Sequence, residues 1–273
     1  MDTFIVTRPD GRLACSEAGA GPLVVLAPGM GDLREVYRDV VGPLVAAGLR
    51  VVTTDLRGHG GSSTGFTAHG VDAVAGDLEA VLEHLGEPAA LVGHSVSAGA
   101  AAVVAARRPD LVTSLVMLSP HLLAHGGALG RALAVVQTQA IRGRLGAAMW
   151  VAYYRSLYRG RRPDWFEEHL GAIRTAMRDR AHVRQLGALA RALVGAAPHV
   201  PLAAVTVPVL VVHGADDPEF PDPAADLAHA EAALTAAPTV TGLLVPESGH
   251  YPHAQRPDVV VPALLAHLAP QRA

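Results

Sequence analysis

The sequence has a single cysteine and no lysine, and both shortages exclude classes of chemistry. Cys15 alone cannot form a disulfide within the chain, a cysteine-only zinc site or an iron–sulfur cluster. All 22 basic residues are arginine. Schiff-base chemistry, which needs a lysine amine, and the phosphate-binding lysine of P-loop and kinase sites are therefore excluded.

The chain also lacks a strong charge and a long apolar run. Its 273 residues carry a formal net charge of only −3, without the basic stripe that a nucleic-acid binder requires. No apolar run approaches the roughly 18–20 residues that span a bilayer, and the first residues, with an acid at Asp2, have no signal-peptide pattern. We therefore expect a cytoplasmic protein with no nucleic-acid partner and no membrane partner. Both a monomer and a homodimer remain open.

The composition is that of a folded protein. Hydrophobic residues make up 50% of the chain and charged residues 17%, which excludes intrinsic disorder. The length fits one large α/β unit with an insertion.

Strand and helix patterns alternate through most of the chain. Short runs rich in valine and leucine predict buried strands, and apolar residues at three- and four-residue spacing predict helices between them. This alternation predicts an α/β fold, with a mostly parallel sheet of eight strands covered by helices on both faces. The expected strands are 4–8 and 11–16, which form an antiparallel edge hairpin, then 22–27, 50–55, 89–93, 111–118, 208–214 and 241–245. The expected helices are 34–47, 71–85, 98–108 and 258–268.

The alternation stops between residues 121 and 200. This segment has helical patterns at 127–145, 147–159, 164–179 and 181–195, and no convincing strand. We interpret it as a helical lid inserted into a core of residues 1–120 and 201–273. It holds 12 of the 22 arginines but only 4 of the 25 acidic residues, and six of the eleven aromatic residues.

The most informative motif is LVGHSVSAGA, where a buried strand runs through GHSVS into an alanine-rich helix. Strand, tight turn and helix expose a serine, here Ser95, at the carboxyl end of a sheet. The free N–H groups at the start of the helix favour negative charge on an attacked carbonyl oxygen. The alternative is an ordinary turn with a serine at the helix start.

A serine hydroxyl needs a base, which is itself held by a third group. Asp217 follows the strand PVLVVHG, and His250 lies in the loop PESGHYPH after the last strand, so both can reach the same edge as Ser95. Other carboxylates compete with Asp217, and His253 competes with His250. His94, beside the serine, is more consistent with a structural role. The competing carboxylates are Asp216, Glu219 and Asp222.

These motifs, with APGMGD (27–32) and DLRGHGGS (55–62), resemble the α/β-hydrolase superfamily over nearly the whole chain. The elbow GHSVSA is similar to that of the small hydrolases related to karrikin and strigolactone receptors. The resemblance implies that Ser95 is the nucleophile, His250 the general base and then acid, and Asp217 the residue that orients the imidazole. It also implies an oxyanion hole made by the backbone N–H groups of Met30 and Val96, and no cofactor.

Two positions depart from the family pattern. Ser97 stands where the elbow usually has glycine, so a tight contact must accommodate a hydroxymethyl group. Pro28 stands where many members have histidine, so a supporting hydrogen bond is lost. We expect the small Ser97 side chain to be tolerated. Pro28 leaves the backbone donor of Met30 unaffected, but we expect the oxyanion hole to be positioned differently.

The insertion should wall the pocket and contact the substrate. Trp150, Tyr154 and Tyr158 share one helix face and predict an aromatic or lipophilic ligand, although simple packing within the lid would give the same pattern. The arginine excess could attract an anionic substrate, but solvated helix faces also explain such charge.

A metal or dinucleotide site is not indicated. The fourteen histidines include the close pairs His121/His125 and His250/His253, but neither has the glutamate of HExxH or a further ligand cluster, and no GxGxxG is present. We therefore predict a cofactor-independent serine hydrolase of a small or medium carboxylic ester or lactone, working through an acyl-enzyme. The alternatives are a carbon–carbon bond hydrolase or biosynthetic acyl transferase or cyclase with the same triad, and a ligand-sensing protein with a slow hydrolase site.

Overall fold

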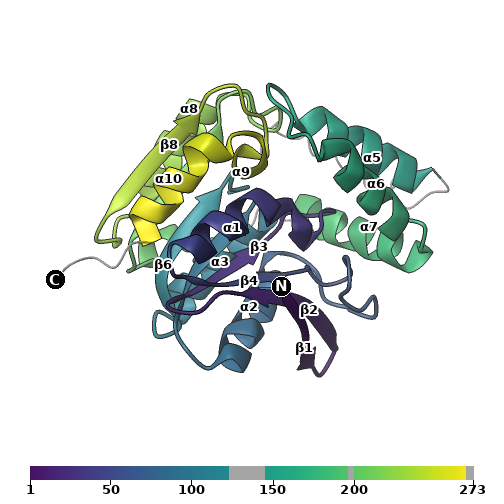
Figure 1. The fold of residues 1–273 in the computed structure, drawn as a ribbon, viewed down its shortest axis with the longest axis horizontal. Coiled ribbons are helices and arrows are strands. Elements are labelled where there is room, and N and C mark those ends of the chain that lie inside the picture. The colour runs from purple at the N-terminus through teal and green to yellow at the C-terminus, as the bar shows by residue number, and fades with distance from the viewer. Residues whose placement is uncertain (123–144, 196–199, 269–273) are drawn as a thin grey trace.

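The computed structural model describes residues 1–122, 145–195 and 200–268 of the chain. Within them, eight strands form one sheet in the order β1-β2-β4-β3-β5-β6-β7-β8 (Figure 1). The strands are β1 (Asp2–Arg8), β2 (Gly11–Ala18), β3 (Leu23–Ala27), β4 (Arg50–Thr54), β5 (Ala89–His94), β6 (Val112–Leu118), β7 (Val209–Gly214) and β8 (Val240–Val245).

The pairing of the strands is mostly parallel. β1 and β2 form an antiparallel hairpin at the edge, β2 runs antiparallel to β4, and all later neighbours are parallel. Parallel neighbours need crossover connections, and the helices between the strands supply them. The predicted α/β fold and its edge hairpin are confirmed.

Seven helical segments accompany the sheet outside the insertion, among the described residues. They are η1 (Arg34–Tyr37), α1 (Arg38–Ala46), α2 (Val71–Leu85), α3 (Val96–Arg107), α8 (Pro223–Ala233), α9 (Pro252–Gln255) and α10 (Pro257–Leu268). A further short turn, η2 (Leu202–Ala204), leads into β7. The short helix α9 and the alanine-rich helix α8 were not expected from the sequence.

Both faces of the sheet are buried, in two separate hydrophobic clusters. On β3, Val25 packs in the cluster that contains α2 and α3, whereas Val24 and Leu26 pack in the cluster that contains α1 and α10. β7 shows the same alternation, with Val211 on one side and Val212 on the other. Because successive side chains of a strand point to opposite faces, a sheet covered on both sides needs the continuous apolar runs seen in the sequence.

The described part of the insertion is helical. α5 (Gly146–Leu157), α6 (Phe166–Ala176) and α7 (Arg180–Gly195) match three of the four expected helices and lie together at the upper right of Figure 1. The fourth expected helix, 127–145, falls largely on residues outside the described ranges. That residues 121–200 act as a lid remains a prediction. No helix in the described ranges is long and apolar enough to cross a membrane.

Candidate active site

Ser95 occupies a strained turn between β5 and α3. Its backbone angles are φ 54° and ψ −118°, and the helix begins at the next residue, Val96. A non-glycine residue held in such a sparsely populated region costs about 1–3 kcal/mol, which the surrounding structure must offset. Gly93 makes the tight turn possible, since a Cβ there would lie 2.3 Å from the Ser97 carbonyl oxygen. The turn leaves Ser95 half-buried, while its neighbours His94 and Val96 are buried.

The parallel register collects the residues that follow the strands at one edge of the sheet. Ala27 of β3 pairs with Gly93, His94 of β5 pairs with Leu118, and Leu118 of β6 pairs with Val212. Chain segments that leave these strands therefore begin beside the serine, as expected for the carboxyl edge of such a sheet.

The loop after β3 packs directly against this turn. A Cβ added to Gly29 would lie 2.7 Å from Nδ1 of His94 and 3.2 Å from the Ser95 Cβ, so glycine allows this close approach. Ser97 donates a hydrogen bond of 2.6 Å from its buried hydroxyl to the Pro28 carbonyl oxygen. The serine that departs from the family pattern thus ties the turn to the loop that carries Met30.

The predicted oxyanion donors lie on these two segments. Met30 is half-buried in the loop after Gly29. Val96 is the first residue of α3, where a backbone N–H has no acceptor within the helix. Their role as an oxyanion hole remains a prediction.

Asp217 and His250 meet in the structure. The Oδ2 atom of Asp217 lies 2.7 Å from Nδ1 of His250, and both residues are at most 3% exposed. Two of the competing acids face elsewhere, because Asp216 is exposed and Asp222 accepts a hydrogen bond from the Ala225 N–H at the start of α8. Asp217 is therefore the carboxylate on Nδ1 of His250.

The loop after β8 that carries His250 is hydrogen-bonded to the end of α5. The His250 N–H donates to the Leu157 carbonyl oxygen at 3.0 Å, and its carbonyl oxygen accepts from Nε2 of His94 at 2.8 Å. The Gln255 amide donates to the carbonyl oxygens of Arg159 and Arg161. The backbone of the histidine is thus held between the insertion and the neighbour of the serine.

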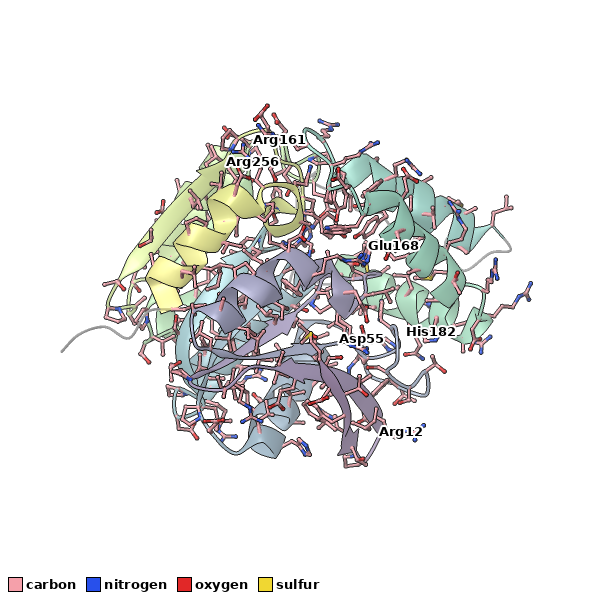
Figure 2. The ribbon with its side chains drawn as sticks, in the orientation of Figure 1. Arg12, Asp55, Arg161, Glu168, His182 and Arg256 are labelled. Carbon is pink, nitrogen blue, oxygen red and sulfur yellow. The ribbon has the colours of Figure 1, made fainter. Side chains whose placement is uncertain are left out.

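Charged side chains also join the insertion to the chain segment around His250. Glu247, just after β8, pairs with Arg161 of the insertion at 3.0 Å and with Arg256 at 3.3 Å. The two arginines lie close together at the top of Figure 2.

The second imidazole nitrogen of His250 contacts a carboxylate and not the serine. Glu219 Oε2 lies 3.0 Å from His250 Nε2, and the Tyr153 hydroxyl on α5 donates to the other oxygen of Glu219. No hydrogen bond joins Ser95 Oγ to His250, although the structure describes both residues. The sequence had suggested Glu219 only as a competitor for the acid of the triad.

The electrostatics follow from this double contact. Burial alone would lower the pKa of His250, but the charges of Asp217 and Glu219 outweigh it and raise that pKa to about 10. Burial would raise the pKa of Glu219, but His250 outweighs it and lowers that pKa to about 2. At neutral pH the site therefore holds an imidazolium between two carboxylates.

The other buried histidines near the site stay neutral. Burial and the charge of His250 lower the pKa of His94 well below its usual value and that of His253 to about 3. Their rings lie 5.0 Å apart. Both ring nitrogens of His253 are buried without a hydrogen-bond partner, so His253 lacks the carboxylate that a catalytic base needs, which leaves His250 as the candidate.

The three aromatic residues predicted to bind substrate are buried against protein. Trp150 donates from its ring nitrogen to the Gly31 carbonyl oxygen at 3.0 Å. The Tyr154 and Tyr158 hydroxyls lie 3.3 Å apart, and the Tyr158 ring stacks on Tyr251 with centroids 4.6 Å apart. All three are at most 2% exposed. Substrate contact by these residues remains a prediction.

A second buried aspartate–histidine pair lies between the insertion and the loop after β3. His169 of α6 contacts Asp32 through Nε2 at 2.6 Å, and both side chains are fully buried. This pair and the Trp150 hydrogen bond fix the insertion to the loop that carries Met30. The sequence gave no signal for it, because the two residues are 137 positions apart.

Metal ligands do not cluster in the described ranges. Within them, no group of three or more histidine, cysteine, aspartate or glutamate side chains is placed to hold a metal ion. Cys15 is buried in the middle of β2, and burial raises the pKa of its thiol to about 11.

Comparison with known proteins agrees with the fold. The model of the alpha/beta hydrolase family matches residues 24–263. The chain is 28% identical to a probable esterase of rice, Oryza sativa subsp. japonica, over 92% of both proteins. It is 30% identical to a monoacylglycerol lipase of Mycolicibacterium smegmatis, covering 73% of this chain and 71% of that protein.

Other matches are more limited in extent or identity. The chain spans only about a third of the length of the first curated relatives, two epoxide hydrolases of Siraitia grosvenorii, at 34% and 38%. Among solved structures, a serine hydrolase involved in carbazole degradation superposes with a TM-score of 0.78, 21% identity and 98% coverage of both chains. At that identity the superposition shows the fold alone.

Proposed function

The chain belongs to the alpha/beta hydrolase family, and within that family we propose that it is a serine hydrolase. Its substrate would be a small or medium carboxylic ester or lactone, with an aromatic or lipophilic part. The reaction needs no cofactor and passes through an acyl-enzyme on Ser95.

The observation that carries the proposal is the pairing of His250 with Asp217, with the His250 ring centroid 4.8 Å from that of His94, the residue before a serine in a strained turn. Nδ1 of His250 lies 2.7 Å from Asp217, and the serine has the positive φ of a nucleophile held at the end of a strand. Asp217 would fix the imidazole tautomer and stabilise the imidazolium that forms during the reaction.

The reaction would proceed in two half-reactions. Ser95 Oγ attacks the carbonyl carbon while His250 Nε2 takes its proton, and His250 then gives this proton to the leaving oxygen. The N–H groups of Met30 and Val96 would stabilise the tetrahedral oxyanion. Water, activated by the same histidine, releases the acid. In the structure Nε2 carries a proton and contacts Glu219, so the first step requires His250 to release that proton to solvent and His250 or Glu219 to move.

The proposal is tested with a panel of p-nitrophenyl esters and lactones. We expect the wild-type protein to hydrolyse at least one of them, and Ser95→Ala to abolish turnover while the melting temperature is retained. Ser114→Ala, at a buried serine on β6 whose hydroxyl contacts Nε2 of His267, serves as the matched control and should keep turnover. Equal turnover by wild type and Ser95→Ala would contradict the role of Ser95.

The alternatives predict different results in the same experiment. A carbon–carbon bond hydrolase would leave aryl esters intact and consume a 1,3-diketone. A ligand sensor would show very slow turnover and a ligand-dependent shift of the melting temperature. Esters hydrolysed by the wild type with many turnovers would rule out both.

A further inference from the structure

Glu219 is a carboxylate in the reaction zone to which the triad gives no role. Its Oε2 atom lies 3.0 Å from Nε2 of His250, the atom that moves the proton, whereas Asp217 already serves Nδ1. A base that must accept a proton from Ser95 does not need a second carboxylate on Nε2. The contact therefore needs its own explanation.

The position of Glu219 is held by the protein. Its backbone N–H donates to Asp217 Oδ1 at 3.0 Å, and its Oε1 accepts from the Tyr153 hydroxyl. Burial and the carboxylate raise the pKa of the Tyr153 hydroxyl, so the hydroxyl stays a donor. The Glu219 side chain is still 21% exposed, which leaves it open to a ligand.

The chemistry of the reaction places Glu219 on the leaving-group side. Nε2 of His250 donates its proton to the oxygen of the departing alcohol, so that oxygen must come within hydrogen-bond distance of Nε2. A carboxylate 3.0 Å from the same nitrogen lies within reach of atoms one or two bonds beyond that oxygen.

We propose that Glu219 is a specificity-determining residue that binds a hydrogen-bond donor, a hydroxyl or a protonated amine, on the leaving group of the substrate. The donor replaces His250 as the partner of the carboxylate. His250 then releases its proton to solvent, and the neutral Nε2 is free to face Ser95. This inference rests on the proposed serine hydrolase function.

Replacement of His250 by a substrate donor keeps the Glu219 carboxylate paired during the reaction. When His250 turns to Ser95, the partly buried Glu219 carboxylate keeps Tyr153 but loses the charge that compensated it. An unpaired carboxylate that is partly withdrawn from water is costly, and a substrate donor removes that cost. An apolar leaving group leaves the carboxylate unpaired, and an anionic one is repelled by it.

The test compares two pairs of butyrate esters of matched shape. The 2-(dimethylamino)ethyl ester, protonated at neutral pH, is compared with the 3-methylbutyl ester, and the 2-hydroxyethyl ester with the propyl ester. We expect the wild-type kcat/KM to favour the ammonium ester over its isostere about tenfold or more, because a hydrogen bond to a charged group discriminates by at least that factor. The hydroxyl ester should be favoured by a smaller factor.

The variants isolate the carboxylate. Glu219→Gln keeps the size of the side chain and should reduce the preference for the ammonium ester to near one. Glu219→Leu should remove both preferences, and Tyr153→Phe should weaken them by freeing the carboxylate. Glu168→Gln removes the same charge from α6, where Glu168 is exposed and pairs with Arg38, and should leave both ratios unchanged (Figure 2).

The outcomes separate the two proposals. Turnover of the apolar esters with no preference for the donor esters, or an ammonium preference kept in Glu219→Gln, would show that the recognition is wrong while the hydrolase function stands. Turnover of none of the four esters, with no labelling of Ser95 by an organophosphonate, would show that the function is wrong and the recognition with it. A preference for donor esters that tracks Glu219 supports both.

Discussion

Replacing Glu219 with glutamine is expected to shift the pH dependence of ester hydrolysis to lower pH. His250 acts as a base only when it is neutral, so kcat/KM rises with pH through the pKa of His250 in the free enzyme. Asp217 and Glu219 raise that pKa to about 10. The kcat/KM of the wild type should therefore still rise with pH above neutrality. In a variant without one of the two carboxylates, kcat/KM should reach its plateau at a lower pH.

The size of the shift follows from the distance between the charges. Two unit charges about 3 Å apart interact by roughly 5 kcal/mol at an effective dielectric constant of about 20. Glu219 is partly exposed, so solvent screens part of this energy. We expect the apparent pKa to fall by about 1–2 units, or about 1.4–2.7 kcal/mol.

Few other groups titrate in the same pH range. His94, His253 and His213 face His250 and have lowered pKa values, while the pKa values of Tyr153 and Tyr251 are raised above the range. Each of these groups therefore keeps one charge state between pH 7 and about 10.

The assay is kcat/KM for a neutral ester from pH 5 to 10, measured for wild type, Glu219→Gln and Glu168→Gln. The Glu168→Gln profile should overlay that of the wild type. Profiles of wild type and Glu219→Gln with the same apparent pKa would refute the electrostatic reasoning.

Three further substitutions test residues that hold the site in place. Asp217→Asn should lower kcat by about three to four orders of magnitude with little change in fold, because asparagine holds the wrong imidazole tautomer; steady-state kinetics would detect it. Ser97→Ala leaves the Pro28 carbonyl oxygen without its buried partner and should cost about 1–3 kcal/mol of unfolding free energy, measured in urea. His169→Phe should cost a similar amount by leaving Asp32 without its histidine, and an unchanged urea midpoint would contradict it.

The sequence predicts the core of the fold well, because the buried strands are short, apolar and separated by amphipathic helices. Each of the eight expected strands overlaps an observed one. The helix α8 was not anticipated, since its alanine-rich stretch buries little beyond Leu227 and Ala230 and has no clear apolar face. The helix α9 has only four residues, too few for a periodic pattern.

The site is predictable only where local sequence determines it. The turn at Ser95 and the carboxylate after β7 follow from strand–turn patterns, and His250 follows from the last strand. The contact of Glu219 with Tyr153 joins residues 66 positions apart, and it depends on how α5 packs over the loop after β7. No local pattern encodes that packing. The hydrogen bond of the Ser97 hydroxyl could not be predicted from local sequence either, since its partner Pro28 is 69 positions away.

The central claim is that Ser95 becomes a nucleophile through His250. Reaction with a fluorophosphonate, followed by peptide mass spectrometry, tests it most directly. The account predicts one adduct, on Ser95, that forms far more slowly in His250→Gln. An adduct on another serine, or equal labelling rates in the two proteins, would contradict it.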